Sequence, residues 1–438
     1  MLKISKIPFL RFFNTRKVVK IIIVFFIAGS IFLTDSDVYA QGGSNYSIFG
    51  IGDLIYGSSS AYQAIGGSQL AVPSANSINM LNPAMWSFVN MTRLQTGYRF
   101  NQNIVSTTSN ELWQNNGGIN GFSSIFNFDA EKNISAVLMF QPISTVNYYM
   151  SSSVKVENEG DTIYGANTYK GSGGLSALTI GVSGKIFDWL HIGGSFAGVF
   201  GNIVHNSTAE FYSNYTTNYE MKQVDDIQTY SLKVGTYLIP TRRLGVGIFY
   251  EYIHNANLDS RSEYTYEVSL GNATDGPLID KKTIKSSSKE KMPQYYGIGA
   301  SYDFGNILLA GDYVVGTYNN LSINRGTNTD FRNMQRVSLG VATVANPSPF
   351  APLSEKISYK FGAYYEQLYY KINKTDMNEF ALTTGVQYPL SRNAHLDLAF
   401  VFGKRGTTDY GLADEKFFKM IIEVSIGDIW FKKIKRQY

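Results

Sequence analysis

The most constraining feature of this sequence is a period-two alternation that recurs along the chain from residue 92 onward. In segments such as 93–100, 336–343, 380–387 and 418–427, one set of alternate positions is mainly apolar and the other is mainly small, polar or charged. A strand with lipid on one face and a polar lumen on the other requires this pattern. A soluble β-sandwich produces the same pattern, so the alternation predicts strands and leaves the architecture open.

The lengths of the connections favour a barrel over a sandwich. Tight turns are expected at 187–190, 240–243, 303–306 and 389–393, and they alternate with longer links rich in Gly, Ser and Asn. Short periplasmic turns and longer external loops are typical of outer-membrane barrels. The longer links are expected at 106–117, 157–173, 211–223, 259–291, 319–331, 373–377 and 404–415.

These turns and links divide residues 92–438 into fourteen expected strands. An even number lets an antiparallel barrel close without a free edge. Most segments also exceed the roughly 9–11 residues that a tilted strand needs to cross a bilayer. The sequence therefore predicts an all-β fold, a 14-stranded antiparallel transmembrane β-barrel. The strands are expected near 92–105, 118–130, 132–148, 174–187, 190–209, 224–239, 244–258, 292–304, 307–318, 332–345, 356–372, 377–389, 394–404 and 415–431.

Residues 1–40 have the organisation of an export signal. A basic stretch ends at Lys20, thirteen apolar or small residues follow at 21–33, and a small-x-small pattern ends at Ala40. An uncleaved anchor is the alternative. Thirteen helical residues rise only about 20 Å, however, which is short of a roughly 30 Å hydrocarbon core. We therefore expect a cleaved signal peptide and a location in the outer membrane of a Gram-negative cell.

Composition and motifs exclude several kinds of chemistry. The chain has no Cys, which excludes disulfides, thiolate metal sites and cysteine nucleophiles. Residues 41–438 carry 32 basic and 32 acidic side chains, a balance that argues against nucleic-acid partners. No phosphate loop, nucleophile elbow or metalloprotease motif is present. The sequence thus predicts no enzyme, no catalytic or metal site and no cofactor. The four histidines have no partner at i+4: His191, His205, His254 and His395.

Residues 41–91 do not follow the alternation of the expected wall. The segment is rich in Gly, Ser and Asn, and it is too long for a loose end and too short for an independent domain. Fourteen strands enclose a bore wider than side chains can fill. We therefore expect this segment to be a plug, or hatch, inside the lumen of the barrel.

Charged side chains on the expected inner face allow two interpretations. They form ion pairs between wall and plug, or they line a path for a ligand. For a carboxylate ligand, an Arg beside an apolar pocket is the natural anchor, and Arg93 and Arg99 are the candidates. The residues in question are Arg93, Arg99, Arg336, Lys360 and Glu366.

Two short motifs in residues 41–91 resemble the N-terminal hatch of FadL-type outer-membrane transporters. They are 64–68 (Ala-Ile-Gly-Gly-Ser) and 82–84 (Asn-Pro-Ala), which stands just before the first expected strand. The strand number agrees, so the resemblance covers essentially all of 41–438. The segments 46–53 and 430–433 resemble the Bacteroidetes-type variant, a branch that also holds FadL-like barrels working in protein secretion. The hatch motif that the resemblance implies consists of Gly66, Gly67, Asn82, Pro83 and Ala84.

The resemblance also implies a function and a side exit. FadL-type proteins passively import long-chain fatty acids or aromatic hydrocarbons, with a lateral exit at a kink in the third strand, next to the Asn-Pro-Ala of the hatch. The third expected strand here contains Gln141 and Pro142. Because proline cannot donate a ladder hydrogen bond, it marks a break or a strand end. For a break, we expect Asn82 to satisfy the freed backbone groups.

Three functions stay open at this point. The first is import of a hydrophobic small molecule, the second is a FadL-like scaffold or shuttle in a protein secretion system, and the third is a general polar porin, against which the hatch-like segment argues. The expected partners are a hydrophobic ligand, outer-membrane lipid and secretion-system proteins. A further partner is the barrel-assembly machinery, because the last strand ends in aromatic residues at 430–431.

Overall fold

The computed structural model describes residues 43–57, 59–108, 110–129, 132–158, 161–270, 275–323, 326, 328–346, 348 and 350–430. The expected signal peptide and the aromatic Phe431 lie outside the described residues. Within the described part, no helix has the length and apolar character that a membrane-spanning helix requires.

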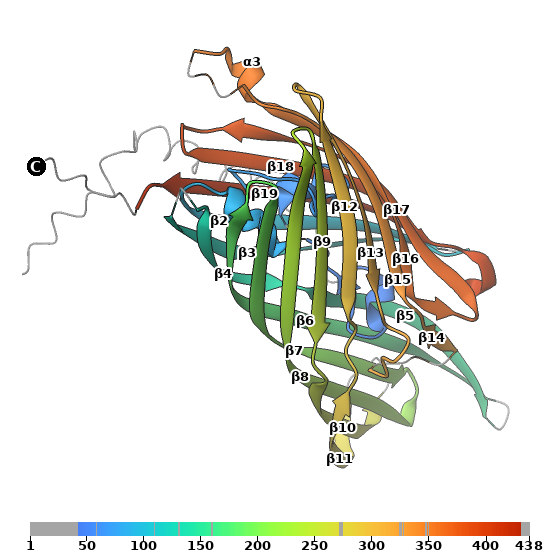
Figure 1. The fold of residues 1–438 in the computed structure, drawn as a ribbon. Coiled ribbons are helices and arrows are strands. Elements are labelled where there is room, and N and C mark those ends of the chain that lie inside the picture. Colours follow the sequence, from blue (N-terminus) through green and yellow to red (C-terminus); the bar gives the residue numbers. More distant parts are fainter. Residues whose placement is uncertain are drawn as a thin grey trace, which may run out of the picture. The chain divides into compact units, whose positions relative to one another are not determined.

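The chain folds into a closed barrel of fourteen antiparallel wall strands, four of which are split in two (Figure 1). The 14-strand prediction is therefore confirmed. In chain order the wall consists of β2 (Thr92–Ser106), β3 (Glu111–Asp129), β4 and β5 (Ile134–Pro142, Ser144–Asn158), β6 (Asp161–Phe187), β7 (Leu190–Phe211), β8 (Asn214–Thr241), β9 and β10 (Leu244–Ile253, Ala256–Leu270), β11 and β12 (Asp275–Glu290, Tyr295–Asp303), β13 (Ile307–Gly316), β14 and β15 (Thr329–Phe331, Met334–Thr343), β16 (Ser358–Ile372), β17 (Thr375–Pro389), β18 (Ala394–Gly406) and β19 (Asp414–Asp428).

The remaining elements are short. Four belong to the segment before the wall, which we call the N-terminal segment (residues 43–91), and two belong to links between strands. They are η2 (Asn45–Ile48), β1 (Asp53–Leu54), α2 (Ser60–Gln63), η3 (Pro83–Phe88), α3 (Leu353–Lys356) and η4 (Asp409–Gly411).

The barrel closes where the last wall strand meets the first. β19 pairs with β2 in an unbroken antiparallel ladder, from Asp414 opposite Ser106 to Asp428 opposite Thr92. Closure removes the free edges that an open sheet would present to lipid.

The alternation seen in the sequence separates the two faces of the wall. On β15 the apolar Leu339 faces outward and is 61% exposed, whereas its neighbours Arg336 and Ser338 are buried toward the lumen. This arrangement gives an apolar outer surface and a polar inner surface, as the period-two pattern predicts.

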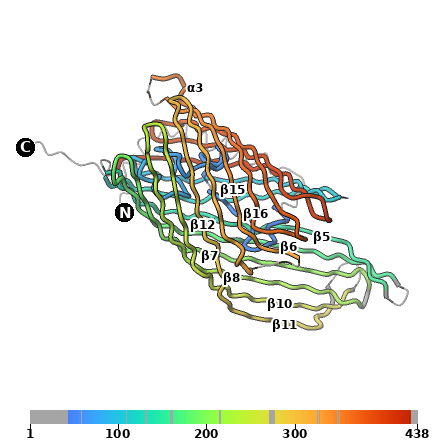
Figure 2. Tube along the Cα trace, turned by 45° about the vertical axis from the view of Figure 1, so that its right-hand side comes forward, coloured from blue at the N-terminus to red at the C-terminus, as the bar shows by residue number. Residues whose placement is uncertain are grey.

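Five of the expected long loops are wrong, because the wall strands continue through them. Residues 157–173 and 211–223 lie mostly within β5, β6, β7 and β8, and 259–291 form the β10–β11 hairpin. Most of 106–117 lies in β3, and 373–377 consists of a two-residue turn and the start of β17. Figures 1 and 2 both show β10 and β11 at the far end of an extended sheet with β7 and β8. The first three segments are polar on both faces, which hides the alternation, while their cross-strand pairs still support a sheet.

One link also departs from the expected order of short turns and long loops. The connection from β15 to β16 (344–357) begins on the rim of the tight turns, where the Val344 amide donates to the Asn306 carbonyl at 2.9 Å. Every other described connection on this rim is short. We call this rim the short-turn rim.

A cysteine pair across the seam tests the closure in a chain that has no Cys of its own. Thr96 lies opposite Val424, and antiparallel partners have Cα atoms about 4.5–5.5 Å apart, within disulfide range. We expect Thr96→Cys with Val424→Cys to form a disulfide, detected by its linked peptide in mass spectrometry. Thr96→Cys with Met420→Cys, displaced by about 13 Å along the strand, should stay reduced. Equal oxidation of the two pairs would contradict the register.

Candidate functional site

The N-terminal segment is bonded to inward-facing side chains from widely separated wall strands. On β13 the Asp312 carboxylate accepts hydrogen bonds from the amides of Gln69 (2.6 Å) and Leu70 (2.9 Å). On β19 the Glu423 carboxylate accepts from the Ser59 hydroxyl (2.8 Å) and the Ser60 amide (2.9 Å). These bonds satisfy donors that have no ladder partner, because the segment has little secondary structure of its own.

Glycines permit the segment and the wall to approach closely. Gly66 has a φ of 75°, and a Cβ there would lie 2.6 Å from the Ala363 carbonyl oxygen of β16. On β9, a Cβ at Gly247 would lie 1.8 Å from the Leu70 carbonyl oxygen. Both contacts exclude a larger residue, so inward-facing glycines mark where this segment packs.

Arg405 of β18 links the beginning of the segment to the wall. Its guanidinium donates to Glu379 of β17 (2.7 Å), to Asp53 (2.7 Å) and to the Ser44 hydroxyl (2.9 Å). The Ser44 hydroxyl in turn donates to Glu415 at 2.6 Å. Nearby, the Tyr46 hydroxyl donates to the Ala413 carbonyl, and burial raises its pKa above the ordinary value.

Two of the other lumen-facing charges also hold the segment. Arg336 pairs with Glu366 at 2.7 Å and donates to the Gly66 carbonyl at 3.1 Å. Lys360 donates to the Ala61 carbonyl at 3.1 Å. Arg336 and Lys360 thus contact the segment through its backbone carbonyls, whereas Glu366 pairs with Arg336 within the wall.

The Asn-Pro-Ala tripeptide lies against the wall but not at the third strand. The Asn82 side chain caps η3 by accepting from the Ala84 amide (3.1 Å), and Pro83 occupies the first position of η3. The Asn82 amide group donates to the carbonyls of Leu70 (2.8 Å) and Thr236 of β8 (3.0 Å). The expectation that Asn82 satisfies groups freed near Pro142 is therefore wrong, because its amide is engaged by the cap and by β8.

The third wall strand is interrupted at Ile143, directly after Gln141 and Pro142. β4 pairs with β3 on one side and β6 on the other. β5 pairs with β6 and with β1, and within the described residues it forms no ladder with β3. The Ile55 amide donates to the Ile143 carbonyl at 2.9 Å, and the Gly43 amide to the Asn147 carbonyl at 2.7 Å. The N-terminal segment therefore replaces β3 as the neighbour of β5.

A cavity of about 270 Å³, which we call the side opening, lies in the wall at this break. The ladder between β3 and β4 ends at the pair Phe122 and Phe140. Beyond the break, the Gln114 amide group of β3 donates to the Tyr149 carbonyl of β5 at 3.0 Å. The lining of the side opening is mainly amide and hydroxyl side chains and glycines, with three apolar residues: Ile55, Ile119 and Pro142.

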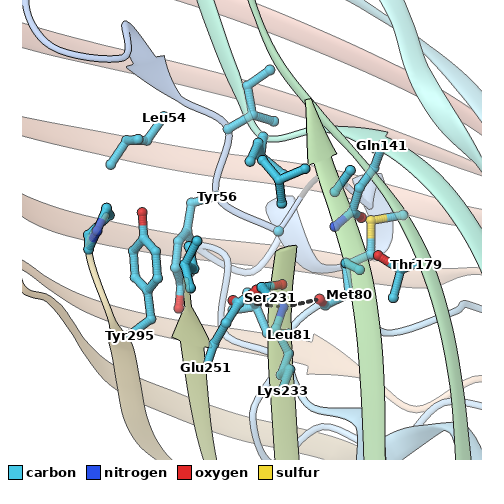
Figure 3. A pocket seen from close by; sticks show the side chains of 18 of the residues that line it. Leu54, Tyr56, Met80, Leu81, Gln141, Thr179, Ser231, Lys233, Glu251 and Tyr295 are labelled. Atoms are coloured by element: carbon cyan, nitrogen blue, oxygen red, sulfur yellow. Dashed lines mark hydrogen bonds and ion pairs between the residues drawn. The ribbon is translucent and has the colours of Figure 1, made fainter. Parts of the chain in front are cut away.

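A second cavity, of about 90 Å³, lies further inside (Figure 3). Most of its lining is apolar. Its polar lining includes the predicted site residue Gln141, and an ion pair between Lys233 and Glu251 at 3.1 Å, with Ser231 donating to Glu251 at 3.0 Å. We call it the inner cavity. Ile55 lines both the inner cavity and the side opening. Its apolar lining includes Ile51, Leu54, Ile55, Ile143, Val199 and Phe249.

The two arginines named as carboxylate anchors lie in different surroundings. Arg93 is 1% exposed, donates to the Ser425 hydroxyl at 3.1 Å and lines neither the inner cavity nor the side opening. Arg99 lines the side opening, and its Nε and Nη2 atoms are buried without a hydrogen-bond partner among the described residues. A guanidinium with unused donors beside a cavity is suited to an anion.

Comparison with known proteins identifies the family. The BamG family model matches residues 18–437. The chain belongs to the BamG family. Among curated proteins, no match was found.

Solved structures similar to this BamG family member share its fold. The monoaromatic hydrocarbon channel CymD has 14% sequence identity and a TM-score of 0.57, with 88% of this chain and 100% of that chain covered. A Pseudomonas aeruginosa FadL homologue has 10% identity and a TM-score of 0.60, covering 87% and 100%. The Ralstonia pickettii toluene transporter TbuX has 12% identity and a TM-score of 0.55, covering 87% and 99%. The fold is thus that of FadL-type outer-membrane channels, as the sequence predicts.

The residues that sequence analysis missed are those of the N-terminal segment beside the break. Leu54 and Ile55 pair with Ser144 and Ile143, about ninety positions later in the chain. A short Asp-Leu-Ile run gives no local signal for such pairing. The available signal was the proline at 142, the residue at which β4 ends.

Replacement of Arg405 tests how the segment is held. Removing one partner of a buried charge pair costs about 3–5 kcal/mol, so we expect Arg405→Met to release residues 43–56 while the barrel stays folded. Because residues 41–91 contain no Lys or Arg, chymotrypsin is the suitable protease. Cleavage after Tyr46, Phe49 or Tyr56 should become at least about tenfold faster.

The matched control for this experiment is Lys404→Met. The Lys404 side chain is 62% exposed and pairs with Asp414 at 3.2 Å, and exposed pairs contribute at most about 1 kcal/mol. Its cleavage rate should equal that of the parent protein. Equal rates for both variants would show that Arg405 does not hold the segment.

Proposed function

We propose that this BamG family member provides a passive route for a small hydrophobic molecule through the outer membrane. The route runs through the inner cavity, past Ile55, and through the side opening into the lipid. The observation that carries the proposal is the position of Ile55, which lines both cavities and pairs with Ile143 across the strand break. The names of the solved relatives, which are hydrocarbon channels and a FadL homologue, support the ligand class.

In this proposal the N-terminal segment acts as a plug, and the structure is its closed state. A cavity of about 150 Å³ is the size that accommodates benzene, whereas the inner cavity measures about 90 Å³. A ligand therefore needs the segment to move. The smallest movement that joins the two cavities is displacement of β1 and Ile55 from β5, which breaks a few hydrogen bonds and leaves the β4–β6 ladder intact.

We further propose that Arg99 anchors a carboxylate, so that a long-chain fatty acid gains an interaction that a hydrocarbon such as toluene lacks. A hydrogen bond to a charged group contributes about 1.5–3 kcal/mol. In cells that lack their own transporter, Arg99→Met should therefore lower uptake of a labelled long-chain fatty acid by about tenfold or more. Toluene uptake should stay within twofold of the parent. An equal loss for both ligands would argue against an anchor and for a structural defect.

A reducible disulfide between β1 and β5 tests whether the ligand passes Ile55. Leu54 lies opposite Ser144 in the β1–β5 ladder, within disulfide range. We expect Leu54→Cys with Ser144→Cys to block uptake when oxidised and to restore it on reduction, because the disulfide fixes β1 to β5. Uptake of the labelled fatty acid and of toluene, before and after reduction, is the measurement.

The control for this disulfide is one that does not touch the route. Ser262 and Ile284 are partners in the β10–β11 hairpin, so Ser262→Cys with Ile284→Cys should transport equally well in both redox states. Undiminished uptake by the oxidised Leu54–Ser144 pair would refute passage past Ile55. No uptake by the correctly assembled parent protein would refute the hydrophobic-ligand proposal as a whole.

A second candidate is a role in assembling or secreting other envelope proteins. The family name, BamG, favours it by suggesting a link to barrel assembly, and the small inner cavity is compatible with a scaffold that carries no ligand. Depletion of the protein should then lower the amounts of other outer-membrane barrels, measured by quantitative mass spectrometry. Rescue by the oxidised Leu54–Ser144 pair would separate this role from passage of a ligand.

A further inference from the structure

Two residues that line the inner cavity carry buried polar atoms with no hydrogen-bond partner among the described residues. One atom is the hydroxyl of Tyr56, in the N-terminal segment, and the other is the side-chain carbonyl oxygen of Gln141, on β4. Figure 3 shows the two side chains on opposite sides of the cavity. Because an unpaired buried polar atom is unfavourable, both atoms are candidates for contact with a bound ligand.

The charged groups of the cavity, in contrast, are paired within the protein. Glu251 accepts from Lys233 and from the Ser231 hydroxyl. Lys233 also donates to the Met80 carbonyl of the N-terminal segment at 3.4 Å. This ion pair thus links two wall strands to the segment, which gives it a structural role that requires no ligand.

The neighbours of Gln141 in the wall explain why its carbonyl oxygen is not paired there. Gln141 lies opposite Ala177 in the β4–β6 ladder, and Ala177 lies opposite Val199 in the β6–β7 ladder. Both neighbours are apolar and line the same cavity. The next residue in the chain, Pro142, has no amide hydrogen to donate. The wall next to Gln141 therefore surrounds an acceptor with apolar groups.

The chemistry of these two atoms favours a hydroxyl group on the ligand. A carbonyl oxygen only accepts hydrogen bonds, whereas a tyrosine hydroxyl both donates and accepts. A ligand hydroxyl can donate to Gln141 and can accept from Tyr56. A hydrocarbon does neither, and a carboxylate only accepts. The apolar remainder of the lining, which includes Ile51, Val199 and Phe249, suits a hydrocarbon body.

We propose that the inner cavity selects apolar molecules that carry a hydroxyl group, such as an alkylphenol, and that Gln141 and Tyr56 bind this hydroxyl. The inference rests on the proposed function, because it uses the same cavity and the same displacement of β1. A site with buried polar atoms discriminates against a ligand that leaves them unpaired. Arg99, which has unused donors, lies at the side opening, so the two positions recognise different polar groups.

Competition against labelled toluene measures this selectivity. The competitors are p-cresol and p-xylene, which have nearly the same shape and differ by a hydroxyl in place of a methyl group. In cells that lack their own transporter and express the full chain, each competitor is titrated until it halves toluene uptake. Comparing the ratio of these two concentrations between parent and variant cancels the different partitioning of the competitors into lipid.

Two substitutions remove the proposed contacts while keeping the size of each side chain. Gln141→Met replaces the amide by an unbranched apolar group, and Tyr56→Phe removes only the hydroxyl. In each variant we expect p-cresol to lose at least about fivefold of its potency relative to p-xylene, which is within the range for one hydrogen bond.

The matched control variants are Gln367→Met and Tyr62→Phe. Gln367 on β16 and Tyr62 in α2 line neither the inner cavity nor the side opening. The Tyr62 hydroxyl is also buried without a hydrogen-bond partner among the described residues, so it controls for the loss of a buried hydroxyl. Both variants should keep the concentration ratio of the parent protein.

Three results would overturn the hydroxyl site while toluene uptake by the parent continues to support the route. They are an unchanged ratio in Gln141→Met, an equal change in the control variants, and loss of toluene uptake in both cavity variants. Heat-dependent migration in a gel verifies that each barrel is assembled. A correctly assembled parent that takes up no toluene would refute the route and this inference together.

Discussion

A strand edge inside a membrane must have its backbone groups hydrogen-bonded, and the rest of this structure depends on how that requirement is met. The pairing of β19 with β2 provides these hydrogen bonds where the barrel closes. At the break after Pro142 the wall itself does not provide them, because β5 has no ladder with β3 among the described residues. The N-terminal segment supplies the missing partner through β1 and Ile55. The same contacts therefore complete the wall and separate the inner cavity from the side opening.

The charges inside the barrel follow from this arrangement. A segment with little regular structure has many backbone groups to satisfy, and burying them without partners would cost about 1–3 kcal/mol each. Inward-facing carboxylates and guanidinium groups, including Asp312, Glu423 and Arg405, accept from or donate to the segment. Several lumen charges thus hold the segment, others pair within the wall, and Arg99 is the lumen-facing arginine with unused donors at the side opening among the described residues.

The structure places several of the predicted site residues next to the wall, and the centre of the site was missed. β4 ends at Pro142, and Gly66 and Asn82 contact the wall, whereas their roles as gate and hatch motif stay predictions. The assignment of Asn82 to the break was wrong, since its side chain caps η3 and bonds to β8. The long loops expected at 157–173, 211–223 and 259–291 were also wrong, because polar residues on both faces of a strand conceal the period of two.

From the residues alone, the fold class and the number and order of the wall strands could be predicted, together with the apolar face of the strands that alternate clearly. These properties depend on local periodicity and on connection lengths, which a single chain displays directly. The pairing of β5 with β1 and the place of Ile55 between two cavities became visible in the folded barrel alone. Pairings between residues about ninety positions apart depend on the spatial arrangement of the whole barrel, and no local pattern encodes them.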